Sequence, residues 1–263
     1  MDIEELRSLI SRCLGDFYRR RSANLQELQL AKFLRKKNPY LFRAFATEKA
    51  SDIVEQILVA FIGASDETIF GDAFFEPIAR IVSSGKVSDA EGVDFTIETD
   101  QAITVVAVKS GPNIYNSSQS KRQSDEFLAV RSRLYKMQKQ FDPVLGHGYG
   151  RKNRPPGRNR VYRDSSGQRF WTELTGDPDF YLKLIRLMED EPATHKDEYA
   201  AAWDGAVNRF TVEFAQSFCF PDGRIDWEKL TGFISEDIPT RDATRKYLPR
   251  RPRSSRQRPQ DCP

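Results

Sequence analysis

The sequence predicts an α/β fold, in which helices surround a small β-sheet and further helices lie toward both ends of the chain. Apolar side chains recur at steps of three and four residues from Ile3 to Ile81 and again from Phe127 onward, which is typical of helices that bury one face. Between these regions, residues 93–98 alternate apolar and polar side chains, and a β-rich run over residues 102–109 follows a short turn. The predicted order is therefore helix, β-hairpin, helix, strand.

Two helices are predicted near the amino terminus. Over residues 2–19 the apolar side chains fall on one helical face, and a second helix is predicted over Leu25–Lys36. The second helix should end before Asn38-Pro39, because the residue before a proline is disfavoured in helical geometry. Together with the next helix, these two are expected to serve as scaffold.

Two more helices are predicted before the hairpin. Ser51 is predicted to cap a helix that ends near Gly63, since glycine is common just after a helix end. The next helix is predicted to begin at Ser65 or Asp66 and to carry an apolar core face. Pro77 should kink or break this helix, because proline has no backbone N–H to donate.

The hairpin brings an acidic and a basic residue toward one end of the sheet. With a turn at about Asp100, residues whose numbers sum to roughly 201–203 lie opposite each other. Asp94 then faces the region from Ala107 to Lys109. Because side chains alternate along a strand, these three residues are predicted on one face.

Beyond the hairpin, the pattern predicts a helix, a third strand and two more helices. The buried face of the first helix runs from Phe127 to Phe141, and the strand is predicted over Pro143–Gly148. Two apolar-striped helices are predicted near residues 179–188 and 196–218.

Composition favours one core and a polar surface. Of the 263 residues, 39% are hydrophobic and 30% are charged. We expect a single domain over residues 1–245, followed by an Arg- and Pro-rich tail, 246–263, that is disordered because it has almost nothing to bury. No apolar run is long enough to span a membrane, and early acidic residues replace the basic flank of a secretory signal. The expected location is cytoplasmic, with no membrane partner.

Cysteine and histidine usage excludes several classes of site. Cys13, Cys219 and Cys262 are an odd set without CxxC spacing, which argues against a disulfide framework and a structural zinc site. The two histidines, His147 and His195, lie beside no obvious nucleophile, so a Ser-His-Asp or Cys-His enzyme is disfavoured. Any chemistry must therefore use carboxylates, lysines or a metal ion.

Positive charge is concentrated in two segments. Residues 151–163 hold six basic and no acidic side chains, and residues 241–263 hold eight basic and two acidic side chains. Because the whole chain carries only +3, the remainder is acidic. Basic segments of this kind suit a polyanionic partner such as DNA, although solvated Arg-rich loops and tails show the same pattern.

Asp94 and Lys109 are the candidate catalytic residues. A carboxylate can hold a hard cation such as Mg²⁺, which activates water and neutralises developing charge, while a nearby ammonium can steady the attacking hydroxide or the phosphorane. This chemistry hydrolyses phosphodiesters. By spacing alone, however, an Asp and a Lys across two strands more often form a half-exposed ion pair.

The same residues lie in a motif that resembles a nuclease family. EGVDFTIE followed by VVAVKSGPN resembles the PD-(D/E)xK nuclease motif, and VKSGPNIYNSSQ resembles the PmeII-like family of type II restriction endonucleases. The likeness continues in NPYLFRA, ETIFGDAFFE, GYGR, GQRFW and DGRIDWEKL. It implies a restriction-endonuclease-like mixed β-sheet flanked by helices, and Mg²⁺-dependent cleavage of double-stranded DNA at a short specific sequence. It also implies a homodimer that acts beside a cognate DNA methyltransferase.

The chain departs from the superfamily motif at Ala107, where the motif has an acid two residues before the lysine. Another carboxylate is therefore expected to complete the metal site with Asp94 and with the backbone carbonyl of Val108, which is carried over from the superfamily pattern. Glu76 is the first choice because it lies on the helix before the hairpin, in a matching segment, although a solvated carboxylate is an equally good interpretation of it. The reserves are Glu91, Glu98 and Asp125.

Two segments supply candidate DNA contacts. After the lysine, side-chain amides and a helix start can hold phosphate, and the glycines and arginines from residue 148 onward can approach the DNA backbone or guanine. Ser118 is equally well interpreted as a helix cap, and the glycines as a simple turn. The candidates are Asn113, Asn116, Ser118, Gln119, Arg151, Lys152, Arg154, Arg158 and Arg160.

Two further functions remain open from the sequence. Loss of the acid at Ala107 would leave a non-catalytic DNA-binding protein on the same fold, which binds DNA in a salt-sensitive manner and cuts none. A repair or recombination nuclease would prefer a four-way junction or a nick over plain duplex. The leading prediction is the restriction endonuclease with Asp94, Lys109 and Glu76 around Mg²⁺.

Overall fold

The structure, a computed structural model, describes residues 1–112, 115–158, 160–189 and 191–248. The chain divides into two compact units. Unit 1 consists of Met1–Asn24 and Ile62–Ala200, and unit 2 consists of Leu25–Phe61 and the residues from Ala201 onward. The single domain predicted over residues 1–245 stays a prediction.

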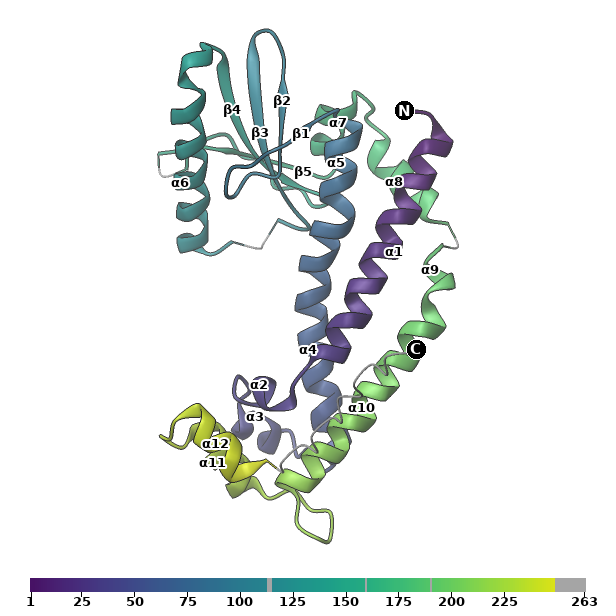
Figure 1. The fold of residues 1–263 in the computed structure, drawn as a ribbon, viewed down its shortest axis with the longest axis vertical. Helices are drawn as coiled ribbons and strands as arrows, with labels where there is room; N and C mark the ends of the chain where they lie inside the picture. The colour runs from purple at the N-terminus through teal and green to yellow at the C-terminus, as the bar shows by residue number, and fades with distance from the viewer. Residues whose placement is uncertain (113–114, 159, 190, 249–263) are drawn as a thin grey trace, which may run out of the picture. The chain divides into compact units, whose positions relative to one another are not determined.

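Unit 1 contains the β-sheet, with helices on both of its faces (Figure 1). Its strands are β1 (Lys86–Val87), β2 (Phe95–Glu98), β3 (Ala102–Lys109), β4 (Gln140–His147) and β5 (Arg163–Ser166). Its helices are the π-helix η1 (Gly71–Phe75), α5 (Glu76–Val82), α6 (Ser117–Leu134), the 3-10 helix η2 (Tyr135–Met137), α7 (Gln168–Thr175), α8 (Phe180–Met188) and α9 (Glu191–Thr194). The helices α1 (Ile3–Glu27), α4 (Ala50–Phe70) and α10 (Lys196–Phe218) begin in one unit and end in the other.

Unit 2 is helical in the part of the chain that the structure describes. Besides portions of α1, α4 and α10, it contains α2 (Leu30–Leu34), α3 (Pro39–Ala44), α11 (Trp227–Ser235) and α12 (Thr240–Tyr247). Lys246 and Tyr247, predicted to belong to the tail, are the last two residues of α12. Residues 249–263 of the predicted tail lie outside the described residues. Among the described helices, none has both the length and the apolar character that a membrane span requires.

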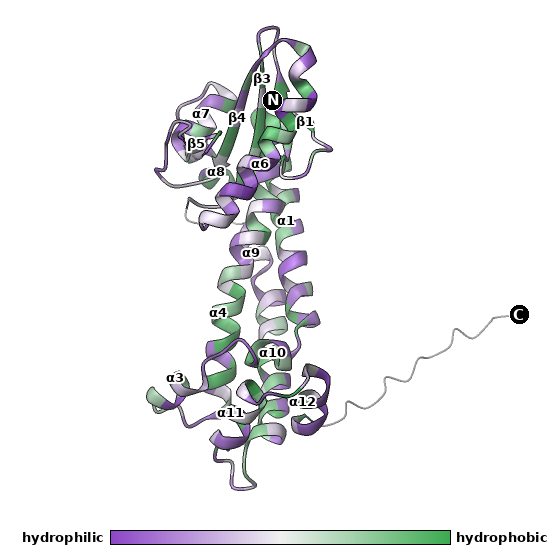
Figure 2. Ribbon diagram, turned by 90° about the vertical axis from the view of Figure 1, so that its left-hand side faces the viewer, coloured by the Kyte–Doolittle hydropathy of each residue, from purple (hydrophilic) through white to green (hydrophobic). Residues whose placement is uncertain are grey.

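The sheet has the order β1-β2-β3-β4-β5, with antiparallel pairing up to β3 and parallel pairing from β3 to β5. The predicted hairpin is confirmed, since Phe95 pairs with Val106 and Glu98 pairs with Ile103. The central strands β3 and β4 are largely apolar, as their green colour in Figure 2 shows. Strands covered by helices on both faces need apolar side chains throughout. The mixed sheet flanked by helices agrees with the predicted α/β fold.

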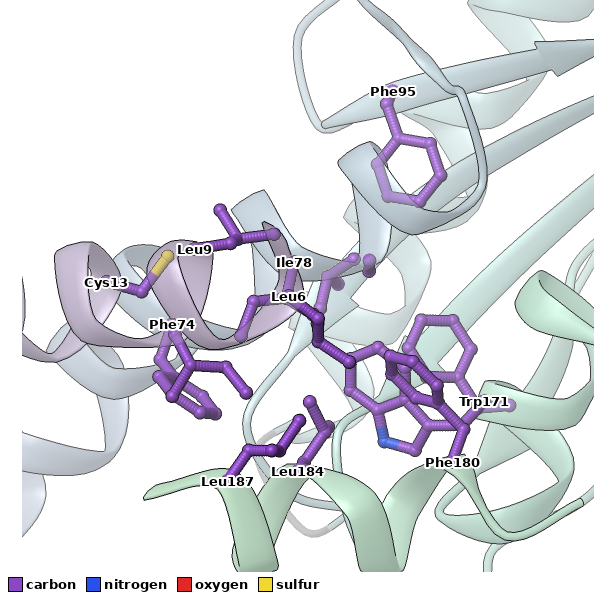
Figure 3. Packing of buried hydrophobic residues seen from close by; sticks show 14 of the residues in the cluster. Leu6, Leu9, Cys13, Phe74, Ile78, Phe95, Trp171, Phe180, Leu184 and Leu187 are labelled. Atoms are coloured by element: carbon purple, nitrogen blue, oxygen red, sulfur yellow. The ribbon is translucent and has the colours of Figure 1, made fainter. Parts of the chain in front are cut away.

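Two apolar clusters pack on opposite faces of the sheet. Phe95, Val106 and Val108 belong to a cluster with α1, α5, α7 and α8, part of which Figure 3 shows. Val105 and Ala107 belong to the other cluster, with α6. Successive residues of β3 thus alternate between the two faces. A slip of one residue would exchange both sets, so burial fixes the register that positions Lys109 at the end of the strand.

The helices before the hairpin differ from their predicted boundaries. α1 continues to Glu27, so Leu25 belongs to the first helix, and the second helix is shortened to α2. α4 passes through Gly63, where the sequence predicts a helix end, and continues to Phe70. Gly63 has no positive φ, and a Cβ there would meet nothing within 4 Å. It is therefore an ordinary helical residue and not the left-handed cap that the prediction requires.

The predicted interruption at Pro77 takes the form of a π-helix. η1 separates α4 from α5, and Pro77 is the second residue of α5. Without an N–H, Pro77 cannot donate to the carbonyl of Ala73, and the wider turn lies immediately before it. Glu76, the candidate metal ligand, is the first residue after that turn.

The elements after the hairpin confirm most of the predicted order. α6 is shorter than predicted: the helix ends at Leu134, and Gln138 in left-handed geometry turns the chain into β4. Phe141, predicted on the helix, therefore lies in the strand. The third strand and the helices α8 and α10 are confirmed. The strands β1 and β5 are additional to the predicted elements.

Candidate active site

Asp94 lies just before β2 and is held by the backbone of β3. Its N–H donates to the carbonyl of Val106 at 2.9 Å, and its Oδ2 accepts a hydrogen bond from the N–H of Val108 at 2.6 Å. Its Oδ1 has no hydrogen bond to any residue that the structure describes. Burial raises the pKa of Asp94, and the hydrogen bond from Val108 and the charge of Lys109 offset part of that rise. The backbone thus fixes one oxygen and leaves the other to face a ligand.

Lys109 is the last residue of β3 and lies beside His147 of β4 in the parallel register. It follows Ala107 by two positions, so it shares that face of the strand. Burial raises the pKa of both Asp94 and Glu76, and the positive charge of Lys109 lowers each in part. No hydrogen bond or ion pair joins its ammonium to another residue in the described ranges. Lys109 is therefore a cation close to two carboxylates and available to a substrate.

Glu76 begins α5 and is half-buried. Burial raises its pKa to about 7, and the negative charge of Asp94 adds to the rise. The charge of Lys109 opposes the rise. Charges shift a pKa in this way only when they lie near one another. The structure therefore brings the three predicted catalytic residues together, from α5, from the residue before β2 and from the end of β3.

Asp72 is a further carboxylate at this place that the sequence analysis did not single out. It is exposed and lies in η1, four residues before Glu76. After burial, the charge of Asp72 is among the causes that raise the pKa of Glu76 and of Asp94. Its signal is in the sequence, because two acids four residues apart in ETIFGDAFFE fall on one side of a helix.

The reserve carboxylates lie in other surroundings. Glu91 accepts a hydrogen bond from Arg122 at 2.5 Å, and Glu98 accepts one from Lys139 at 2.7 Å. Asp125 is exposed on α6. Among these candidates, Glu76 is the carboxylate whose pKa responds to both Asp94 and Lys109.

The oxygen atoms at this place suit a hard cation. Asp94 and Glu76 offer carboxylate oxygens, and Mg²⁺ in proteins is held by one or two carboxylates, with water and phosphate completing its six oxygens. Among the residues that the structure describes, no group of three or more His, Cys, Asp or Glu side chains forms a ligand set. The donors therefore fit Mg²⁺ held together with a phosphate, and they do not fit a closed zinc-type cage.

The polar residues after Lys109 start helix α6. Asn116 and Gln119 form a capping box, in which each side-chain oxygen accepts a hydrogen bond from the other residue's N–H at 2.9 Å. Asn116 is the cap, so Ser118, which is exposed in the first turn of the helix, is not. Asn113 lies outside the described residues. The side-chain oxygens of Asn116 and Gln119 thus serve the helix start, while Ser118 remains open to a ligand.

The basic residues after β4 fall into two groups. Lys152 and Arg160 face the buried carboxylate of Asp164: Arg160 forms an ion pair with it, and the Lys152 ammonium lies 3.8 Å from its Oδ1. The other group is exposed, and its side chains are bonded to no residue in the described part of the chain. This second group consists of Arg151, Arg154 and Arg158. These three side chains are free to meet a phosphate or a base edge.

A cavity of about 830 Å³ opens between the ends of β4 and β5 and the helix α8. Trp171, Tyr181 and Arg151 are among its lining residues, and none of the three predicted catalytic residues is.

Comparison with known families gives a match to a nuclease family. The model described as type II restriction endonuclease EcoO109I matches residues 4–197, about three quarters of the chain. The matched range includes the hairpin, Glu76 and the basic segment after β4. It bears out the broader prediction from the motifs, a type II restriction endonuclease family, and not the PmeII-like family specifically. A search of curated proteins finds no match.

Proposed function

Because the chain belongs to the EcoO109I family of type II restriction endonucleases, we propose that it cleaves double-stranded DNA at a short specific sequence in a Mg²⁺-dependent reaction. The observation that carries the proposal is the meeting of Asp94, Lys109 and Glu76 at one end of the hairpin, where their charges affect one another. An ordinary surface ion pair would leave Lys109 bonded to its partner, whereas its ammonium is bonded to no described residue.

Asp94, Glu76 and the backbone carbonyl of Val108 are the proposed Mg²⁺ ligands. A bound Mg²⁺ supplies a positive charge that polarises the scissile phosphate and acidifies the attacking water. The N–H of Val108 orients the Asp94 carboxylate before any cation arrives. Burial, and then the negative charge of Asp94, disfavour the charged form of Glu76, and a bound cation would favour it.

Lys109 is proposed to act on the phosphate itself. Its ammonium lies close to both carboxylates and can donate to the attacking oxygen or to a phosphate oxygen as negative charge develops. The exposed side chains of Arg151, Arg154 and Arg158 are proposed to hold the DNA backbone beside it. Ser118 at the start of α6 is a further proposed phosphate contact.

The finer features of the activity are also proposals. The described residues of one chain form one such site, whereas a duplex has two strands to cut. We therefore propose a homodimer that places one site on each strand. The string VKSGPNIYNSSQ supports a closer relationship to the PmeII-like enzymes. The proposed setting is the cytoplasm, beside a DNA methyltransferase that protects the same sequence.

A plasmid cleavage assay tests the proposal. With Mg²⁺, the wild-type protein should convert supercoiled plasmid into discrete fragments, and both Lys109→Ala and Glu76→Gln should abolish this. Glu98→Gln is the matched control, because Glu98 is an acid on the hairpin that pairs with Lys139 away from the site, and it should cleave as the wild type does. Salt-sensitive DNA binding without cleavage in any divalent cation would favour the non-catalytic DNA-binding protein instead. Preference for a four-way junction or nick would favour a repair nuclease.

A further inference from the structure

His147 is a buried histidine beside the proposed active site that the mechanism above does not use. It ends β4 and lies next to Lys109 in the parallel register. Only 1% of its surface is exposed. A side chain with two ring nitrogens in such a place must satisfy both of them within the protein.

Both ring nitrogens of His147 face hydrogen-bond acceptors. Nδ1 lies 3.0 Å from the carbonyl oxygen of Gly111, and Nε2 lies 3.2 Å from Oδ1 of Asp164. A carbonyl can only accept. Asp164 is also an acceptor, because Arg160 and Lys152 both place positive charge against its carboxylate. Two acceptors are satisfied together only when each ring nitrogen carries a hydrogen, that is, by an imidazolium.

Four side chains form what we call the Asp164 hub: His147, Lys152, Arg160 and Asp164. Asp164 is 2% exposed, so this carboxylate is withdrawn from solvent and needs these partners. Lys109 on β3 is in register with His147. Lys152, Arg160 and His147 thus surround a single carboxylate.

The Asp164 hub joins the turn after Lys109 to the basic loop after β4. On the turn, the His147 ring holds the carbonyl of Gly111, and the Lys152 ammonium holds the carbonyl of Pro112 at 2.9 Å. On the loop, the backbone of Lys152 is held by β5, since its carbonyl accepts a hydrogen bond from Ser166 Oγ at 2.6 Å. His147 and Lys152, which both meet Asp164, therefore also hold the backbone that follows the proposed catalytic lysine.

We propose that His147 is a positioning residue: its imidazolium ties Gly111 to Asp164 and thereby holds Lys109 and the basic loop in the geometry that cleavage requires. This inference rests on the proposed function. A neutral ring has a single N–H. The other ring nitrogen would then face the carbonyl of Gly111 or the carboxylate of Asp164 as a second acceptor, and the turn after Lys109 or the basic loop would shift. A shift on the order of 1 Å in a positioned group can reduce a rate roughly 100-fold.

The protonation of His147 can be measured directly on the intact protein. The chain has two histidines, so ¹⁵N imidazole spectra contain two ring systems, and His195→Gln assigns them. At about pH 7.5 both ring nitrogens of His147 should carry a hydrogen, as the two acceptors that they face require. A neutral tautomer pattern for His147 would overturn the inference.

Cleavage kinetics test the positioning role. His147→Gln should lower kcat by roughly 10- to 100-fold, because Lys109 shifts. KM for DNA should change less than about threefold, because Lys152, Ser166 and Asp164 still hold the loop whose arginines are proposed to bind DNA. His195→Gln, the matched control, should cleave as the wild type does. Unchanged kcat in a folded His147→Gln variant would overturn the inference. If the wild type cleaves no DNA, the proposed function fails, and the spectra still decide the state of the ring.

Discussion

The charged form of Glu76 lowers the free energy of unfolding, as expected of a carboxylate placed to bind a metal ion. Glu76→Gln should reveal this loss of stability. Burial first, and then the charge of Asp94, raise the pKa of Glu76 from its ordinary value of 4.5 to about 7. Between these two pH values the folded protein binds a proton that the unfolded chain does not bind. Stability therefore falls as the pH rises through this window, and the full penalty is present above about pH 7. Glutamine carries no charge at any of these pH values, so it removes the penalty.

The magnitude follows from the size of the shift. A rise from 4.5 to about 7, at about 1.36 kcal/mol for each pKa unit, corresponds to about 3.4 kcal/mol for a site without solvent. Glu76 is only half-buried, and solvent screening reduces the figure to about 1–2 kcal/mol. Glu76→Gln should therefore be more stable than the wild type by about 1–2 kcal/mol at about pH 8, and equally stable near pH 4.5.

Urea unfolding with EDTA, at both pH values, measures this difference. Glu98→Gln is the control with the opposite expectation, because its hydrogen bond from Lys139 lowers the pKa of Glu98 and its removal should give no gain at about pH 8. Adding Mg²⁺ should then stabilise the wild type and leave Glu76→Gln unchanged. The reasoning would be refuted if Glu76→Gln gained no more stability at the higher pH than at the lower one.

Three further predictions follow from single side chains. Asp94→Asn should keep the hydrogen bond to the β3 backbone, so its circular dichroism spectrum should match that of the wild type. Its cleavage rate should fall at least about 100-fold, because the side chain no longer offers a negative charge to the metal ion. Retained activity would contradict the proposed role of Asp94 as a metal ligand. Gly167→Ala should lower stability by about 1–3 kcal/mol in thermal unfolding, since Gly167 has φ +54 and a Cβ would lie 2.5 Å from the carbonyl oxygen of Gly150; an unchanged melting temperature would count against the described backbone. Arg154→Ala with Arg158→Ala should weaken DNA binding and lower the slope of log K against log salt by about two, and an unchanged slope in a filter-binding titration would exclude these contacts.

The hairpin was predictable because its signal is local. Residues 93–98 alternate in polarity, the next strand is rich in β-branched residues, and a short polar turn joins them. The register then follows from the position of the turn, and with it the placing of Asp94 near the end of β3. Glu76 could be named because it lies on the helix before the hairpin, but its approach to Asp94 depends on tertiary packing that no local pattern encodes.

β5 was not predictable from apolar alternation. Its sequence, RDSS, is polar, yet Asp164, Ser165 and Ser166 are all buried. Ion pairs and hydrogen bonds from distant residues make this burial possible, and Asp164 depends on partners up to 17 positions away. The contacts of the Asp164 hub could not be predicted either, because they join residues that lie far apart in the sequence.

The helix boundaries show a second limit of prediction from the sequence. The apolar period of α4 is the same on both sides of Gly63, and periodicity alone does not specify where a helix ends. A glycine cap ends a helix by taking up left-handed geometry, and Gly63 keeps helical geometry. By contrast, Pro77 acts through covalent structure, and the interruption near it was predictable.

Sequencing the ends of plasmid fragments tests the central claim most directly, namely that Asp94, Lys109 and Glu76 form a site-specific Mg²⁺-dependent nuclease centre. Digestion by the wild-type protein with Mg²⁺ should give fragments whose ends all share one short sequence and one cut position, and Lys109→Ala should give none. Fragments with unrelated ends, or the same ends from Lys109→Ala, would contradict it.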